Sequence, residues 1–255
     1  MMDILAWLLP YKGALVLTAL AGFLLLDRLV PVAKVRGGLM RVAKNLSLAG
    51  VNAVLSWAIV VPVSAIAASH ALDWRPAWWS GGQGLLLDML LLDCWIYFWH
   101  RANHVVPMLW RFHEVHHLDT FLDASSALRF HFGEVVLSSL VRALVIFLLG
   151  VPLASVIAFE TVLAVVSMFQ HSNVRLPRWL ERPLSYVIVT PSIHWVHHHA
   201  LRQDTDSNYA TVLSVWDRVF NSRSATDRTP AMPIGVEGLG DRGLLELLKR
   251  PFTPR

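Results

Sequence analysis

The chain has 255 residues, of which 55% are hydrophobic and only 16% are charged. Its formal net charge is +4, but the Lys and Arg residues lie in short segments between long apolar runs, which argues against a nucleic-acid-binding protein. These runs and a mean hydropathy of +0.49 indicate a polytopic membrane protein. The single cysteine, Cys94, excludes an internal disulfide, a cysteine-ligated iron–sulfur cluster and a thiolate zinc site.

Apolar runs predict membrane-spanning helices over residues 4–26, 46–72 and 85–104. The segment 27–45 is basic, and the positive-inside rule places it in the cytoplasm, with the N-terminus outside. Residues 73–84 are rich in Trp, Pro and Gly, which predicts a turn in the aromatic belt of the outer interface. The expected fold is therefore an all-α polytopic bundle.

Two further apolar runs, 135–150 and 152–169, predict a helical hairpin. The first run is short for a full crossing, so the hairpin need not reach the far interface. Arg142 and Glu160 lie inside it, and charges at membrane depth are usually paired, so we expect these two to pair with each other. Residues 223–255 contain no run that could span a membrane, and their Pro, Gly and Arg content predicts a peripheral tail.

Histidines form the main chemical signal of the sequence. His100 and His104 are one helical turn apart, so both imidazoles can hold one ion. Asp93 and Tyr97 continue the same 4, 3, 4 spacing and are candidates to orient these ligands. The alternative is a polar stripe with only a structural role, and this pair alone does not decide between them.

The second cluster, HEVHH at residues 113–117, fits two patterns. As HExxH it is typical of a zinc metalloprotease in which His113 and His117 bind the metal and Glu114 acts as the base. As HxxHH it supplies three imidazoles, including His116, and the glutamate is incidental. Both readings remain open on this cluster alone.

The third cluster, HWVHH at residues 194–198, repeats the HxxHH spacing with Trp195 where a protease needs glutamate. All three clusters are predicted on the cytoplasmic side, in a helical cap. Their eight histidines are twice what one tetrahedral zinc uses, which favours two metal ions. A third reading is a non-catalytic protein that binds haem or metal through paired histidines.

Further elements resemble the fatty acid hydroxylase and sterol desaturase superfamily of integral-membrane di-iron enzymes, whose pattern is HxxxH followed by two HxxHH boxes. Residues 93–104 resemble its D-x3-Y-x2-HR-x2-H element, and LWRFHEVHH its LW-x-FH-x-VHH element. ALRFHFGE is similar to R-x-HP-x-E, with Phe132 in place of proline. HSN, TPSIHWVHH and DSNYATVLSVWDRVF follow in the expected order, so the resemblance covers about residues 85–220.

The resemblance implies which residues build the site. It adds His131 and His171, which as isolated histidines are otherwise read as structural, whereas His70 and His199 are left out. The implied iron ligands are His100, His104, His113, His116, His117, His131, His171, His194, His197 and His198. Side chains implied to orient or brace them are Asp93, Tyr97, Arg129, Glu134, Asn173, Asp206, Asn208 and Asp217. No catalytic side chain beyond the ligands is expected.

The resemblance also implies an activity: two irons use O2 and external electrons to hydroxylate or desaturate a C–H bond of a lipid, such as a fatty acyl chain or a sterol. Zinc is a possible substitute in purified protein, because imidazole binds both metals. The expected organisation is residues 1–84 as N-terminal helices and outer turn, 85–222 as the catalytic region including the hairpin, and 223–255 as the tail, in one integrated domain.

The expected partners are the membrane, a lipid substrate and a separate electron donor of the cytochrome b5, ferredoxin or rubredoxin type with its reductase, and no nucleic acid. A bacterial inner membrane is the expected location. The predicted lipid pocket lies between the third helix and the hairpin, with Phe98, Trp99, Trp110, Phe112 and Trp195 as candidate lining residues. Arg175, Arg178 and Arg182 are candidates for docking an acidic donor.

Two departures from the family pattern stand out. Asn221 and Ser222 replace the usual Gly-Thr after the WD-x-x-F element, and Ala210 replaces the glycine of NYG. Both lie near the end of the pattern, so we expect them to affect packing more than metal binding.

Overall fold

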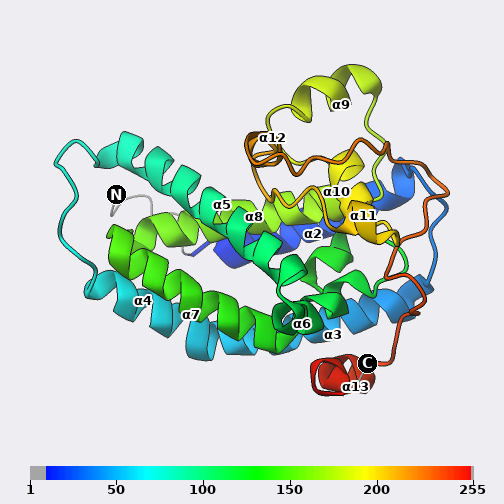
Figure 1. The fold of residues 1–255 in the computed structure, drawn as a ribbon, viewed down its shortest axis with the longest axis horizontal. Coiled ribbons are helices and arrows are strands. Elements are labelled where there is room, and N and C mark those ends of the chain that lie inside the picture. The colour runs from blue at the N-terminus through cyan, green and yellow to red at the C-terminus, as the bar shows by residue number, and fades with distance from the viewer. Residues whose placement is uncertain (1–9, 254–255) are drawn as a thin grey trace.

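The computed structural model describes residues 10–253, and these form a bundle of helices (Figure 1). The sequence prediction of an all-α membrane bundle is confirmed. The helices that build the bundle are α2 (Lys12–Leu29), α3 (Gly38–Leu55), the π-helix η1 (Ser56–Val60), which joins α3 to α4 (Val61–Ser69), α5 (Gly81–Val105), α7 (Phe132–Leu149) and α8 (Leu153–His171). The other elements are α6 (Pro107–His117), η2 (Ala124–Leu128), α9 (Arg178–Leu184), α10 (Pro191–His197), α11 (Arg202–Thr205), α12 (Val215–Val219), α13 (Leu244–Lys249) and η3 (Arg250–Phe252).

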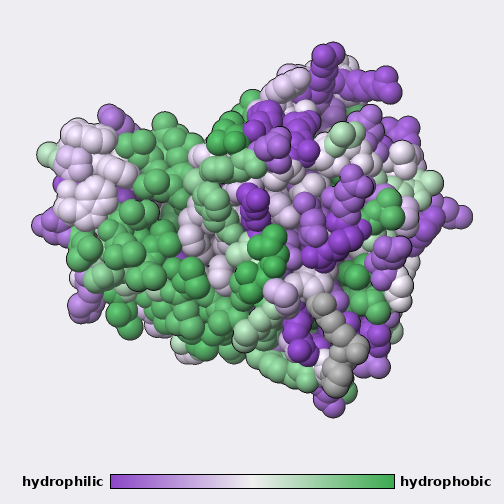
Figure 2. All heavy atoms as spheres, in the orientation of Figure 1, coloured by the Kyte–Doolittle hydropathy of each residue, from purple (hydrophilic) through white to green (hydrophobic). Residues whose placement is uncertain are grey.

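Three helical segments of the described chain are long and apolar enough to cross a membrane: Gly38–Ser69, Phe132–Leu149 and Leu153–His171. The first joins α3, η1 and α4 into 32 residues. Apolar side chains such as Val54 and Leu144 are 66% and 56% exposed, as expected for a surface that faces lipid. On the face drawn in Figure 2, hydrophobic residues form a broad area across the left and centre, most hydrophilic residues gather at the right, and a smaller hydrophilic group lies at the far left.

Two helices expected to span the membrane differ from the prediction. Residues 4–9 of the first expected span lie outside the described residues, and the rest forms α2, which carries Lys12, Asp27 and Arg28. Helix α5 is not among the three most apolar segments because it contains Asp88 and Asp93. Both carboxylates are buried and hydrogen-bonded, so α5 is a core helix of the bundle rather than a uniformly apolar span.

The hairpin is present, and its first arm is longer than the sequence suggested. Helix α7 has 18 residues and reaches the length of a crossing. Gly150 ends it in the left-handed conformation (φ 64°), where an added Cβ would lie 2.9 Å from the Leu72 carbonyl oxygen. The predicted pairing within the hairpin is confirmed: Arg142 Nη2 lies 2.8 Å from Glu160 Oε1, and Lys12 Nζ lies 2.8 Å from Glu160 Oε2.

Two prolines turn the chain so that the histidine helices face one another. Pro107 is the first residue of α6, and the extended residue before it ends α5. Helix α6 therefore folds back against the end of α5 instead of continuing it. Pro191 begins α10 in the same way after the extended Thr190. We call the part of the molecule that contains α6, η2 and α9 to α13 the histidine end.

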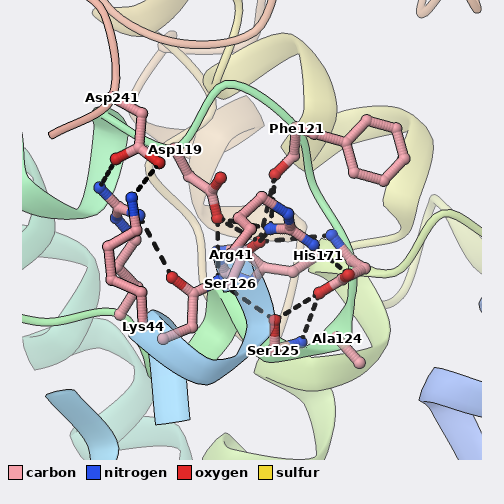
Figure 3. A network of polar contacts seen from close by, with 12 residues as sticks. Arg41, Lys44, Asp119, Phe121, Ala124, Ser125, Ser126, His171 and Asp241 are labelled. Atoms are coloured by element: carbon pink, nitrogen blue, oxygen red, sulfur yellow. Dashed lines mark hydrogen bonds and ion pairs between the residues drawn. The ribbon is translucent and has the colours of Figure 1, made fainter. Parts of the chain in front are cut away.

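A buried polar network ties the loop after α6 to α3 (Figure 3). The Arg41 guanidinium, 4% exposed, pairs with Asp119 at 2.7 Å and also with Asp123. Ser126 Oγ donates to Asp119, and Asn45 Nδ2 donates to the same carboxylate oxygen. Since the loop begins directly after His117, this network fixes the C-terminal end of the histidine helix.

The C-terminal segment, which the sequence suggests is peripheral, is anchored at two buried points. Asp241 accepts from Arg129 at 2.6 Å, and Arg250 donates to Glu114 at 2.7 Å. Leu247 of α13 is fully buried against Leu48. Residues 241–250 therefore pack on the outer side of α6.

Replacing Arg41 with methionine should destabilise the protein, because two buried carboxylates would lose their cation. Breaking a buried pair on one side costs about 3–5 kcal/mol. We expect Arg41→Met to lower the melting temperature of the detergent-solubilised protein by several degrees, whereas Arg36→Met, at an exposed position, should leave it unchanged. Equal melting of the two variants would contradict this role.

Candidate metal centre

Nine buried histidines form two adjacent groups, each compact enough to hold a metal ion. The first, group A, contains His100, His104, His113, His117 and His197. The second, group B, contains His116, His171, His194 and His198. In each group the candidate ligand atoms lie within 4.8 Å of one another. The structure thus brings together nine of the ten histidines that the resemblance implies.

The two HxxHH boxes share their histidines between the groups. In each box the first and last residues are four apart and lie on one face of the helix, while the middle residue points about 100° away. His113 and His117 therefore enter group A, and His116 enters group B. The other box does the reverse: His194 and His198 enter group B and His197 enters group A.

Five of these nine histidines have Nδ1 within hydrogen-bonding distance of an oxygen atom that accepts hydrogen bonds and has no proton to donate. Four of the partners are backbone carbonyls, and the distances are 2.8 Å for His100 to Tyr209, 3.2 Å for His116 to Arg129, 2.7 Å for His171 to Ser167 and 2.7 Å for His197 to Ser207. The fifth is His113, 2.8 Å from the Glu134 carboxylate. Each Nδ1 must therefore carry the proton, and each Nε2 carries a lone pair.

These lone pairs point at one another. His116 Nε2 lies 3.1 Å from His171 Nε2, although neither atom has a proton to share once Nδ1 is protonated. The Nε2 atoms of His113 and His197, both buried, have no hydrogen-bond partner among the described residues. Two facing lone pairs at this distance repel unless a cation lies between them, and spacings near 3 Å are those of nitrogen ligands on one metal ion. The residues therefore fit a two-metal centre.

Burial keeps the imidazoles neutral. It lowers the pKa of His197 to about 3 and lowers the pKa of His117 and His198 well below the usual value, with neighbouring histidines adding to the effect. Metals bind the neutral ring, so no proton has to be displaced near neutral pH.

A cavity of about 360 Å³ lies beside both groups, between α5 and α8. His100 and His113 line it from group A, and His116, His171 and His194 from group B. The remaining wall combines apolar side chains with polar ones. The apolar ones are Ile96, Trp99, Ala127, Leu128, Phe130, Leu163 and Ala164, and the polar ones are Ser56, Asn103, Glu134, Glu160, Ser167, Gln170 and Thr211. Of the five aromatic residues predicted to line a lipid pocket, only Trp99 does so.

The other four aromatics pack elsewhere. Phe98 packs against Phe220 with tilted rings, and Phe112 packs against His131. Trp195 is buried against Phe121. Trp110 contacts the ring of His104 and faces a second, polar cavity of about 690 Å³ on the opposite side. The sequence alone does not show which of the five aromatic residues line the cavity, because all five lie within three residues of a predicted histidine ligand.

His131 lies outside both groups. Its Nδ1 accepts from the Gly133 N–H at 2.9 Å, which caps α7, and its Nε2 lies 3.1 Å from the Leu248 carbonyl. Both ring nitrogens therefore have protein partners, an arrangement typical of a structural histidine. The resemblance that implies a ligand here rests on the ALRFHFGE element, in which Glu134 is the residue that reaches group A.

Three of the predicted orienting residues touch ligands. Glu134 accepts from His113, and Arg129 contributes its carbonyl oxygen rather than its guanidinium to His116. Asp206 lies 3.5 Å from His104 Nδ1. The backbone carbonyls of Ser167, Ser207 and Tyr209 do the same work and were not predicted, because a main-chain acceptor leaves no side-chain signal in a sequence.

The remaining predicted residues hold the loops around the site. Asp93 accepts from the backbone N–H of Val212 and Leu213 and from Trp216. Asp217 accepts from Ser222, whose hydroxyl also contacts that of Tyr97. Asn173 pairs with the backbone of Ala33, and Asn208 with those of Ile193 and Ser224. These five brace the chain that carries the ligands.

The two departures from the family pattern have structural explanations. Asn221 is left-handed (φ 51°), a conformation that asparagine tolerates better than most residues and that explains a preference for glycine. Ser222 keeps a hydroxyl 2.8 Å from Asp217. Ala210 is fully buried, and its N–H donates to Asp217. The Ala210 N–H belongs to the same peptide group as the Tyr209 carbonyl that accepts from His100.

Residues 85–222, more than half of the chain, match the family model described as fatty acid hydroxylase. The chain belongs to this family. An ornithine lipid hydroxylase of Rhizobium tropici is 28% identical over 76% of this chain and 58% of its own length. An alkylglycerol monooxygenase of Danio rerio is 32% identical over 59% of this chain and 32% of its own length.

A very-long-chain aldehyde decarbonylase of Oryza sativa is 29% identical over 60% of this chain and 26% of its own length. The chain therefore spans between a quarter and three fifths of the length of these relatives. No solved structure matches the chain.

The placement of His131 leads to a test by metal content. We expect His116→Ala to lower the amount of metal bound per chain, because it removes a group B nitrogen. His131→Ala should keep the metal and cost about 1 kcal/mol of stability through the lost helix cap. Elemental analysis measures the metal bound by each variant, and thermal unfolding measures its stability. Loss of metal from His131→Ala would show that His131 is a ligand.

Proposed function

We propose that the protein is a membrane-bound di-iron oxygenase that hydroxylates or desaturates a C–H bond of a lipid with O2 and external electrons. The observation that carries this is the pair of histidine groups beside one apolar cavity. A lipid chain can enter such a cavity from the bilayer, since α5 and α8 form its walls. The relatives named for lipid hydroxylation and alkylglycerol monooxygenation support the same reaction class.

Iron bound at the two groups would supply O2 activation and a shared two-electron oxidation. The protein's own residues do the rest. Carbonyl oxygens and Glu134 hold five of the nine rings in the tautomer that presents Nε2, which orients these rings before a metal binds. Apolar side chains such as Ile96 and Leu163 hold the lipid chain and exclude water.

A zinc protease built on HEVHH fits the structure poorly. Glu114, which would act as the base, forms an ion pair with Arg250 and is 3% exposed. It lines the polar outer cavity and not the one beside the metal groups. A haem protein would use only two axial histidines, whereas nine converge here.

The electron donor is proposed to be a separate protein that approaches the histidine end. This end carries exposed Arg175, Arg178 and Arg182, the last two on the projecting helix α9 (Figure 1), and an acidic donor would be attracted to them. Charge reversal of the three arginines should slow reduction by an acidic donor.

We also propose that the histidine end is cytoplasmic in a bacterial inner membrane, because the basic segment 27–45 lies there.

Metal content and the optical spectrum test the proposal directly. Purified protein should contain two irons per chain and no haem Soret band. One zinc per chain in protein expressed with ample iron would support the protease instead. Lipids extracted from cells with and without the protein should differ by an added oxygen or a double bond, and mass spectrometry of the extract measures this.

A pair of substitutions separates oxygenase from protease. His198→Ala removes a group B ligand and should abolish lipid oxidation. Glu114→Gln should leave at least about half of the activity, because Glu114 pairs with Arg250 on the outer side of α6 and does not line the cavity beside the histidine groups. The opposite result, an inactive Glu114→Gln and an active His198→Ala, would exclude the di-iron reading.

A further inference from the structure

The cavity beside the histidine groups contains three buried oxygen atoms with no hydrogen-bond partner among the described residues. They are Asn103 Oδ1, Glu134 Oε2 and Gln170 Oε1, and all three residues line the cavity. Asn103 and Gln170 are 1% exposed and Glu134 is 5% exposed. Buried acceptors are nearly always satisfied in folded proteins, so three in one cavity indicate a missing donor.

Neighbouring contacts identify two of these atoms, Asn103 Oδ1 and Glu134 Oε2, as acceptors. Asn103 Nδ2 donates to Glu134 Oε1 at 3.1 Å, which fixes the amide so that Oδ1 is its free end. Glu134 Oε1 also accepts from His113, so the carboxylate is held on one oxygen while the other remains open. The cluster therefore seeks a hydrogen-bond donor.

The three acceptors lie at the level of the metal groups and not deeper in the cavity. Asn103 directly precedes His104, and Gln170 directly precedes His171. The apolar wall lies further along the same helices: Leu163 is eight residues before His171, roughly 12 Å along α8. The cavity thus has a polar end beside the histidine groups and a mainly apolar end further along, which also includes the Glu160 carboxylate, paired with Arg142 and Lys12.

We propose that Asn103, Glu134 and Gln170 form a subsite for a hydrogen-bond-donating head group of the lipid, such as a hydroxyl, with the chain extending into the apolar end. This proposal rests on the lipid oxygenase function proposed above and names its substrate class. Its consequence is positional: the C–H bond beside the metals lies within a few bonds of the polar group. A lipid bound this way is oxidised near its head group and not near the methyl end of its chain.

Two probes that differ by one donor test the subsite. Dodecanol has a hydroxyl proton, whereas dodecyl methyl ether has an oxygen that only accepts. Iron-loaded protein in detergent should bind the alcohol about tenfold more tightly than the ether, since the ether leaves buried acceptors unpaired. The measurement is competition of each unlabelled probe against radiolabelled dodecanol.

Three variants assign the preference to the subsite. Gln170→Met and Asn103→Leu keep side-chain size while removing an acceptor, so each should reduce the alcohol preference at least about threefold. Leu163→Ala changes only an apolar part of the wall and should weaken the binding of both probes by the same factor. Iron content is measured in every sample, since Asn103 and Gln170 adjoin ligands.

Equal affinity for both probes in iron-loaded wild-type protein would overturn the subsite, and so would a preference that survives in both polar variants. Neither result affects the proposed function, which fails separately if the protein holds no iron or leaves cellular lipids unchanged. A preference that falls in the two polar variants and persists in Leu163→Ala supports the subsite.

Discussion

Everything at the histidine end depends on one requirement: nine uncharged rings must present their lone pairs to the same small volume. Left alone these lone pairs repel, as the 3.1 Å approach of His116 to His171 illustrates. The protein meets this requirement by fixing the other side of five rings on carbonyl or carboxylate oxygens. A cation at each group would remove this repulsion, which would couple the folding of this region to metal binding.

The division of the two HxxHH boxes follows from helical geometry. Each helix directs two histidines to one group and the third to the other, so α6 and α10 are both shared by the two groups. Neither group can be completed by a single helix. This exchange holds the two metal positions at a fixed separation, because a shift of either helix displaces ligands of both.

The sequence was sufficient for the helical class, for the pairing of Arg142 with Glu160 and for nearly all the histidines that converge, because spacing along a helix determines which side chains share a face. It could not assign ligands to groups, since that depends on how α6 packs against α10. It could not reveal the backbone carbonyls that accept from the histidine rings. It also implied His131 as a ligand through the ALRFHFGE element, in which Glu134 is the residue that contacts a group A histidine. The anchoring of residues 241–250 through Asp241, Leu247 and Arg250 was missed because short apolar pairs such as Leu247 and Leu248 carry no periodic signal.

The contacts of that last segment have a consequence for biogenesis. Arg250 and Asp241 follow every histidine in the chain, yet they neutralise Glu114 on α6 and anchor Arg129, whose carbonyl orients His116. During synthesis the three histidine boxes therefore leave the ribosome before the residues that complete their support. A nascent chain stalled before residue 241 would therefore carry all nine histidines without the contacts of Asp241 and Arg250.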